Sequence, residues 1–214
     1  MKKPTLFIHC GSGPGINYKP IMEEILESID RSDVDVDVKI YSVCNFPDEE
    51  WALKENHHPS WEFGEFHTVG ELKKLCDSSD DFFPVGYIHT RGACHPGVEA
   101  VNDHRKYMCY FLLENMKTCI DYINEGYDGV GVDWHEKPQR HFSGNFWWSS
   151  SEYIRSLPDL NSDEVPGMPN SPRHKNEFFV GVNNPKVKCL HHSNIDVGQR
   201  HIVRYPEENY VSKK

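Results

Sequence analysis

Polar side chains that could take part in acid–base, phosphate-binding or metal-binding chemistry follow the ends of several apolar runs in this sequence of 214 residues. These residues are His9, Cys10 and Gly11; His89, Thr90 and Arg91; Asp133; Ser143 and Asn145; and His191 or His192. In an open α/β fold, ligands bind beyond the carboxyl ends of the strands, where such groups gather. The pattern therefore predicts a functional rim along one edge of a central sheet.

The segment His89-Thr-Arg-Gly92 carries more polar groups than a strand-ending turn requires. A metal ion, a phosphate or a sugar could each be bound there. The glycine-rich turn at residues 10–15 resembles a nucleotide-binding opening, in which backbone N–H groups face a phosphate. It has neither the spacing of a dinucleotide-binding motif nor the Lys-Ser/Thr pair of a P-loop, so a plain tight turn is the favoured interpretation.

Asp35-Val-Asp37 spells D-x-D, which is a metal-binding signature. Here the carboxylates alternate with Val34, Val36 and Val38, and that is the period of a half-buried strand with one solvated face. We therefore interpret both aspartates as solvent-facing residues and not as metal ligands.

Composition disfavours several classes of protein. A formal net charge of -10 argues against a nucleic-acid partner, because Lys and Arg carry most of the affinity for the phosphate backbone. Seven scattered cysteines without a C-x-x-C pair suggest neither a disulfide framework nor a zinc ribbon, which favours a reducing compartment. With no signal-like start and no apolar run of about 18 residues, we expect a cytoplasmic protein without a transmembrane segment.

Known catalytic motifs narrow the classes further. The sequence has no G-x-S-x-G nucleophile elbow, no H-E-x-x-H zinc-protease motif and no H-x-E with P-C-x-x-C of the deaminases. Hydrolase and zinc-enzyme interpretations are disfavoured accordingly. A metal-dependent hydrolase that uses the many histidines nevertheless remains open as an alternative.

Hydrophobic periodicity predicts one α/β domain over residues 1–214, with the last few residues as a flexible tail. We expect strands at residues 5–9, 34–40, 83–90, 128–134 and 186–192, and helices at 21–29, 68–76 and 102–125. Thr68 and Glu71 have the spacing of a capping box, so the second helix should begin at Thr68. Residues 44–67, apart from one short helix, and residues 158–173 are expected to be loops.

The stretch His141-Phe-Ser-Gly-Asn-Phe-Trp-Trp148 is the most informative part of the chain. Its aromatic residues predict a strand, and the serine run that follows predicts a helix start. Gly144 and Asn145 interrupt the strand where another group can approach the backbone. Adjacent tryptophans on a strand point to opposite faces, so we expect one of Trp147 and Trp148 to be buried and the other to face a cleft.

Several of these segments resemble glycosyltransferases of the GT-A type. A group of bacterial and large-virus sugar transferases is similar at Tyr87-Ile-His-Thr-Arg-Gly92, Arg105 with Met108 and Phe111, His141 to Trp148, Tyr153, and Leu157-Pro158. The likeness covers residues 83–181 and is most specific at the Trp-Trp motif. It implies a GT-A-like, Rossmann-type domain with a central mixed sheet flanked by helices.

The resemblance also implies roles for individual residues. Glu177 takes the position of an acidic residue that faces the reacting sugar, and Asp133 competes for that role. The donor nucleotide would contact His9, Cys10, Gly11, Thr90, Arg91 and Arg105, and the sugar would contact Ser143, Gly144, Asn145 and Trp147 or Trp148. In GT-A enzymes a D-x-D motif holds the divalent ion, but His89-Thr-Arg91 stands at that place here. A Mn²⁺ or Mg²⁺ ion would then be held by His89 and His191, or Arg91 would supply the positive charge.

We therefore expect a divalent-metal-dependent transferase that moves a hexose or deoxyhexose from a nucleotide-diphosphate sugar to a glycan acceptor. The resemblance favours a UDP-sugar and a retaining outcome. The protein would act in the cytoplasm, that of the host if it is viral, as part of a longer multidomain chain. A non-catalytic module that binds nucleotide sugars or carbohydrates is the alternative, because the D-x-D is missing.

Overall fold

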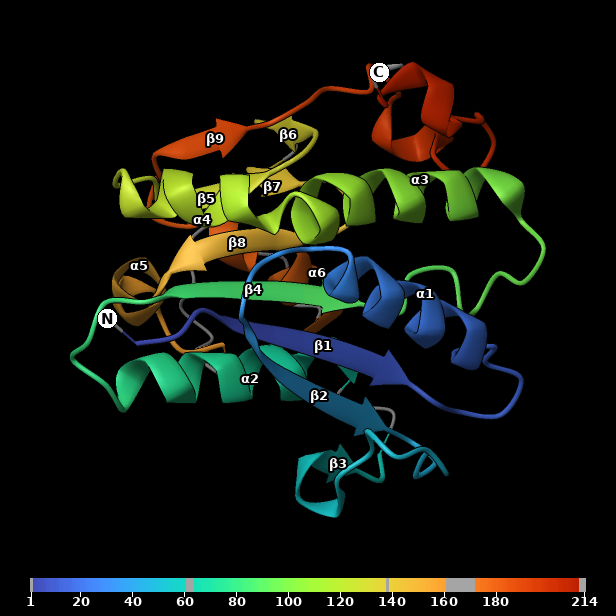
Figure 1. Cartoon of the computed structure of the whole chain (residues 1–214), viewed down its shortest axis with the longest axis horizontal. Coiled ribbons are helices and arrows are strands. Elements are labelled where there is room, and N and C mark those ends of the chain that lie inside the picture. Colours follow the sequence, from blue (N-terminus) through green and yellow to red (C-terminus); the bar gives the residue numbers. More distant parts are fainter. Residues whose placement is uncertain (1, 61–63, 138, 161–171, 212–214) are drawn as a thin grey trace.

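The computed structural model of the chain describes residues 2–60, 64–137, 139–160 and 172–211. Within these residues a seven-stranded sheet has the order β3-β2-β1-β4-β8-β5-β9. Its strands are β1 (Thr5–Gly11), β2 (Asp37–Val43), β3 (His57–His58), β4 (Pro84–His89), β5 (Gly129–Gly131), β8 (Trp147–Ser150) and β9 (Val187–Cys189). Only β8 runs antiparallel to its neighbours, so the sheet is mixed and mostly parallel, as expected (Figure 1).

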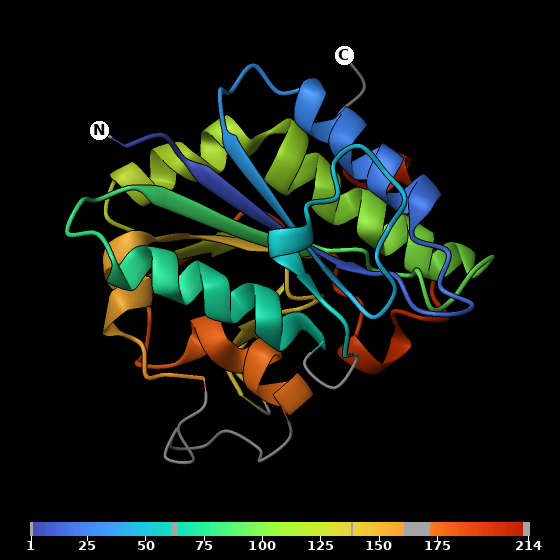
Figure 2. The ribbon, with the colours of Figure 1, turned by 90° about the horizontal axis from the view of Figure 1, so that it is seen from below.

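Helices cover both faces of the sheet (Figure 2). One face carries α1 (Lys19–Asp30), α3 (Glu99–Cys109) and α4 (Met116–Asn124), and the other carries α2 (Gly64–Asp77), α5 (Ser151–Ser156) and α6 (Pro172–Phe178). Successive residues of a strand point to opposite faces, so β1 contributes to two cores. Ile8 packs in the core beneath α1, α3 and α4, and Phe7 packs in the core beneath α2 and α5.

Short elements complete the fold. They are the 3-10 helices η1 (Lys54–Asn56), η4 (Phe179–Gly181), η5 (Val197–Gln199) and η6 (Glu207–Asn209), the π-helical segment η3 (Tyr110–Glu114), and a hairpin of β6 (Trp134–His135) with β7 (His141–Phe142). Within the described ranges, no helix is long and apolar enough to cross a membrane.

The predicted start of the second helix is wrong. Helix α2 begins at Gly64, and Thr68 is a fully buried residue inside it. The Thr68 hydroxyl lies 2.8 Å from Nδ1 of His9, so it contacts β1 instead of capping a helix. The Thr68 side chain therefore makes a tertiary contact with β1 and not the helix cap that the local pattern predicted.

The predicted long helix at residues 102–125 is interrupted. The chain instead forms α3, the π-helical turn η3 and α4. A π-turn breaks the regular helical hydrogen bonding and is often found at functional sites. The carbonyl of Leu112, in this turn, accepts a hydrogen bond of 2.8 Å from Nε1 of Trp148. The interruption thus joins the helical layer to β8.

The predicted aromatic strand is also divided in two. β7 pairs with β6, whereas β8 lies in the central sheet, and Gly144 and Asn145 between them have φ of 90° and 56°. The helix start is confirmed, because the side chain of Ser150 accepts a hydrogen bond from the backbone N–H of Tyr153. The two tryptophans do lie on opposite faces, but Trp147 and Trp148 are both buried, at 1% and 0% exposure. The expectation that one faces a cleft is wrong.

The interpretation of the D-x-D spelling is confirmed. The Asp35 side chain is 89% exposed and pairs with Lys3, and the half-exposed Asp37 pairs with Lys39. The strand itself begins later than predicted, at Asp37. Of the predicted loop at 158–173 and the flexible tail, residues 161–171 and 212–214 lie outside the described residues.

Candidate functional site

The carboxyl ends of β1, β4, β5 and β9, with the amino end of β8, form one edge of the sheet, which we call the rim (right in Figure 1). Backbone and side-chain hydrogen bonds join the carboxyl ends of β1 and β4. The N–H of Gly11 donates to Oγ1 of Thr90 at 3.3 Å, and the N–H of Thr90 donates to the carbonyl of His9 at 3.0 Å. Cys10 lies in the core, where burial raises the pKa of its thiol to about 12 and so disfavours the thiolate form.

On the α2 side of the rim lies a group that we call the Glu65 cluster, made of Glu65, Tyr87, His89 and Asn145. Oε2 of Glu65 accepts a hydrogen bond of 2.8 Å from the Tyr87 hydroxyl and one of 2.9 Å from Nδ2 of Asn145. The other carboxylate oxygen, Oε1, lies 3.8 Å from Nδ1 of His89. The cluster therefore presents an acceptor oxygen that no neutral donor has taken among the described residues.

The Glu65 carboxylate is ionised. Burial raises its pKa, but electrostatic interactions with the His89 and His9 rings and the hydrogen bonds from Tyr87 and Asn145 lower it, and the net pKa lies below the usual value. His9 itself is charged only in acid, because burial lowers its pKa to about 4 against the opposing charge of Glu65. Glu65 is not apparent from the sequence, because it lies in a stretch without hydrophobic periodicity and matches no motif.

On the α3 side of the rim lies the Arg200 cluster, made of Arg200, Asp133, His104, His135 and Ser193. Asp133 is buried. Its Oδ2 accepts a hydrogen bond of 2.7 Å from Nη1 of Arg200 and one of 2.9 Å from the Ser193 hydroxyl. Its Oδ1 accepts 2.6 Å from the N–H of Ser193. Nη1 of Arg200 also donates to Nε2 of His104, and Nη2 lies 3.4 Å from Nε2 of His135.

The turn at Gly144 and Asn145 links the two clusters. The Gly144 carbonyl accepts a hydrogen bond of 3.0 Å from Nε2 of His89. Oδ1 of Asn145 accepts a hydrogen bond of 3.0 Å from Nε1 of Trp147. On its other side, a Cβ added at Gly144 would lie 2.6 Å from Sδ of Met108 and 3.0 Å from Cε1 of His104. Only glycine fits there, because the site combines this close approach with a φ of 90°.

The remaining predicted residues have varied surroundings. The Arg105 guanidinium donates one hydrogen bond of 2.9 Å to each carboxylate oxygen of Glu24 and one of 3.1 Å to the carbonyl of Arg91. It therefore holds the turn after β4 in place. The N–H of Ser143 donates 3.1 Å to the carbonyl of Asp133. Glu177 is half-buried on α6.

The two predicted metal ligands lie in different surroundings. The His89 ring packs against Phe146 and has Nδ1 3.8 Å from Oε1 of Glu65, whereas the His191 ring stacks on Phe111 and has Nδ1 3.2 Å from the Tyr107 hydroxyl. In the described part of the chain, no three His, Cys, Asp or Glu residues form a group that could hold a metal ion. Both carboxylate oxygens of Asp133 already accept hydrogen bonds from Arg200 and Ser193. Among the described residues, His89 and His191 are therefore not joined by further ligands into one group, and the expected Mn²⁺ or Mg²⁺ ion stays a prediction.

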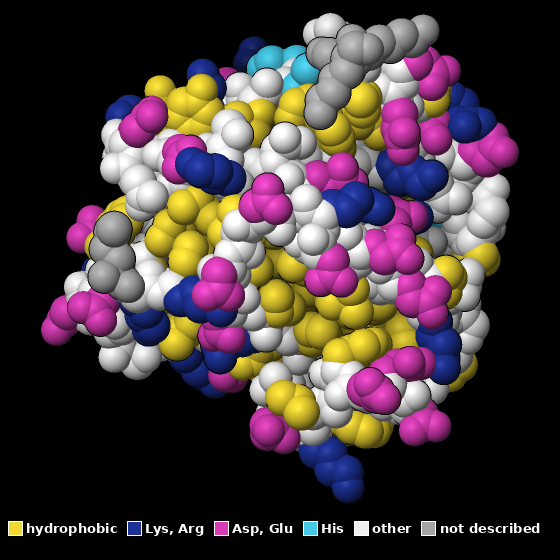
Figure 3. Space-filling model, in the orientation of Figure 1, with side chains coloured by type: hydrophobic (Ala, Val, Ile, Leu, Met, Phe, Trp, Pro, Cys, Tyr) yellow, Lys and Arg dark blue, Asp and Glu magenta, His cyan; other side chains and the backbone are white. Residues whose placement is uncertain are grey.

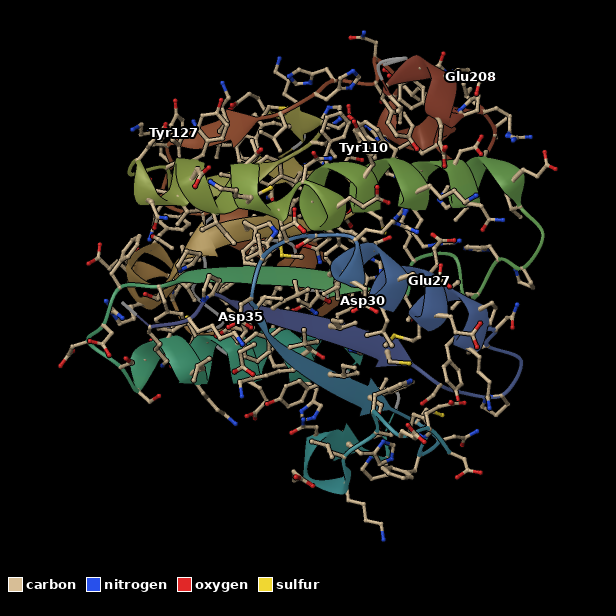
Figure 4. All side chains as sticks on the ribbon, viewed as in Figure 1. Glu27, Asp30, Asp35, Tyr110, Tyr127 and Glu208 are labelled. Carbon is tan, nitrogen blue, oxygen red and sulfur yellow. The ribbon has the colours of Figure 1, made fainter. Side chains whose placement is uncertain are left out.

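A separate groove of about 580 Å³ lies between α1, η3 and η6. Its lining includes glutamates and two tyrosines, namely Glu23, Glu24, Glu27, Glu114, Glu207, Tyr110 and Tyr210. Acidic side chains are prominent on this face in Figure 3, and Figure 4 shows Glu27 on α1 with Tyr110 above it. Five glutamates against Arg31 and Lys106 give the groove an excess of negative charge that disfavours a phosphate, which leaves the rim as the better candidate for a nucleotide.

Fold and rim together define a mixed α/β domain with two polar clusters at one sheet edge. A family model described as a domain of unknown function (DUF8361) matches residues 24–181, which is most of the chain. The protein belongs to this family. The matched region contains the Glu65 cluster and Asp133, and it ends before Arg200. No curated protein matches the sequence.

Proposed function

We propose that this protein is a glycosyltransferase of the GT-A type that moves a hexose or deoxyhexose from a UDP-sugar to a glycan acceptor. The observation that carries the proposal is the meeting of two polar clusters from opposite sheet faces at the Gly144-Asn145 turn. The mixed, mostly parallel sheet supports the GT-A part. In length, the chain is similar to the amino-terminal glycosyltransferase domain of a chlorella virus protein that builds capsid glycans.

The Glu65 cluster is suited to the sugar. Its ionised carboxylate and the buried amide of Asn145 are hydrogen-bonding groups of the kind that sugar hydroxyls need. Oε1 of Glu65, which Tyr87 and Asn145 leave untouched, can also accept a proton from a hydroxyl group. Glu65 thus joins Glu177 as a candidate acid–base residue.

Asp133 is less suited to that role. Both of its oxygens already accept hydrogen bonds, one of them from a buried guanidinium, and the residue is only 2% exposed, so an acceptor hydroxyl group has little access to it. We assign to it the positioning of Arg200. The tryptophans act in the same indirect way, because Trp147 is buried and orients the Asn145 side chain.

Thermal unfolding in the presence of UDP, GDP and CMP, each with and without Mn²⁺, tests the proposal. A ligand that binds only the folded state raises the melting temperature, and we expect UDP to do so most strongly. Stabilisation by none of the three would contradict the proposal. Stabilisation by UDP without breakdown of any UDP-sugar would favour the binding module, which the full pairing of Asp133 also supports.

A further inference from the structure

The groove between α1, η3 and η6 is a second place where the protein can bind another molecule. None of the residues that line it belongs to the Glu65 cluster or to the Arg200 cluster. Its volume of about 580 Å³ is that of a binding site, for which about 300–1,000 Å³ is usual. The proposed function leaves this groove without a role.

Two of the five glutamates that line the groove are already paired with arginines. The carboxylate of Glu24 accepts hydrogen bonds of 2.9 Å from Nε and Nη2 of Arg105. Oε1 of Glu114 accepts one of 2.9 Å from Nη2 of Arg31. These pairs join α1 to α3 and to η3, so they hold the walls of the groove together.

The other three glutamates, Glu23, Glu27 and Glu207, are exposed. Within the part of the chain that the structure describes, Glu23 and Glu207 form no ion pair, and Glu27 lies 3.9 Å from Arg31, which is closer to Glu114. Only Lys106 adds a further positive charge to the lining. Glu23 and Glu27 are also four positions apart on one helix, where like charges repel each other. A cation in the groove would relieve this repulsion.

Two tyrosines complete the groove. The rings of Tyr110 and Tyr210 have centroids 5.4 Å apart, and in Figure 4 Tyr110 lies between Glu27 on α1 and Glu208 in η6. Burial raises the pKa of Tyr210, and the charges of Glu207 and Asp103 raise it further, so the ring lies in a negative potential. The faces of aromatic rings attract ammonium and guanidinium groups. The groove therefore offers a cation both carboxylates and aromatic rings.

We propose that this groove is a docking site for a basic segment of a partner protein, whose arginine or lysine side chains contact the unpaired carboxylates and the two tyrosine rings. Arginine suits the groove best, because its planar guanidinium both pairs with carboxylates and stacks on aromatic rings. The exposed glutamates line an open groove, so a chain that crosses the surface can reach them directly. The inference goes beyond the proposed function and does not depend on it.

Fluorescence anisotropy with a short dye-labelled peptide of alternating arginine and glycine residues, at low ionic strength, tests the docking site. We expect the wild type to bind the peptide and added salt to weaken the binding, because the contacting charges are exposed. Glu23→Gln combined with Glu27→Gln removes two charges with little change of shape, and it should weaken binding about fivefold or more.

Glu125→Gln combined with Glu152→Gln is the matched control. Both residues are exposed and neither lines the groove, so the net charge changes equally while the groove stays intact. This variant should bind the peptide nearly as the wild type does. It separates binding in the groove from general attraction to a protein with a net charge of -10.

The role of the aromatic ring is tested at Tyr210. Tyr210→Leu should weaken peptide binding about threefold, because the aliphatic side chain has no ring face for the cation. Tyr210→Phe keeps the ring and should bind as the wild type does. Melting temperatures show which variants are folded, and if Tyr210→Leu is not, the two glutamine double variants decide, since they change only exposed side chains.

Four results would overturn the docking site. The first is no binding of the arginine peptide by the wild type at low ionic strength. The second is equal weakening in the groove variant and the matched control, which would show non-specific attraction. The third is competition by free spermidine at the affinity of the peptide, which would make the occupant a small polyamine. The fourth is an unchanged affinity in both the glutamine groove variant and folded Tyr210→Leu.

Discussion

The two clusters at the rim solve the same physical problem in opposite ways. Each keeps a carboxylate out of bulk water, but the Glu65 side chain is 29% exposed and takes hydrogen bonds from neutral groups, whereas Asp133 is 3% exposed and pairs with a guanidinium. The first cluster is left with a free acceptor and the second with free donors. The accessible carboxylate of the first cluster and the closed ion pair of the second should therefore respond differently to substitution.

The largest effect should come from breaking the buried ion pair. Arg200→Leu leaves Asp133 buried without its cation, and such a loss costs about 3–5 kcal/mol of the free energy of unfolding. Urea denaturation measures it. Adding Asp133→Asn should restore much of the loss, because the stranded charge is gone. A cost below about 1 kcal/mol for the single variant would show that the pair is not buried as described.

A smaller effect is expected at the turn that joins the clusters. Gly144→Ala must adopt a φ of 90° and also displace Met108, so we expect a loss of about 2–4 kcal/mol in unfolding free energy. Gly97→Ala is the matched control, because Gly97 has a φ of 79° with open space around its Cβ position. It should lose only about 1 kcal/mol, for backbone strain. Equal losses at the two positions would argue against close packing of Gly144 on α3.

His9, beside the Glu65 cluster, should make the stability of the protein depend on pH. His9 is neutral in the folded state with a pKa of about 4, but its unfolded pKa is the usual 6.5, so the unfolded chain binds the extra proton in between. Stability contributed by His9 is therefore present above about pH 6.5 and is lost as the pH falls toward about 4. Between about pH 7 and pH 5, the loss amounts to about 2 kcal/mol. His9→Gln, measured by urea denaturation at both pH values, should remove this part of the slope, and an unchanged slope would contradict it.

Some of the site could be predicted from the sequence because it follows from local pattern. Strand ends are marked by polar residues after apolar runs, so His89, Thr90 and Asp133 were found at the rim. Glu65 and Arg200 were not found, because each acts through contacts far along the chain: Glu65 with Asn145, 80 residues away, and Arg200 with His104, 96 residues away. Such pairings depend on how whole elements pack, and no local period records them.

Release of UDP from a UDP-sugar tests the central claim most directly. The account predicts that the wild type releases UDP and that Glu65→Gln lowers the rate about a hundredfold by removing the acceptor of the Glu65 cluster. A wild-type melting temperature for the variant would show that the fold is intact. Release of UDP at the same rate by both proteins, or by neither with any nucleotide sugar, would contradict the account.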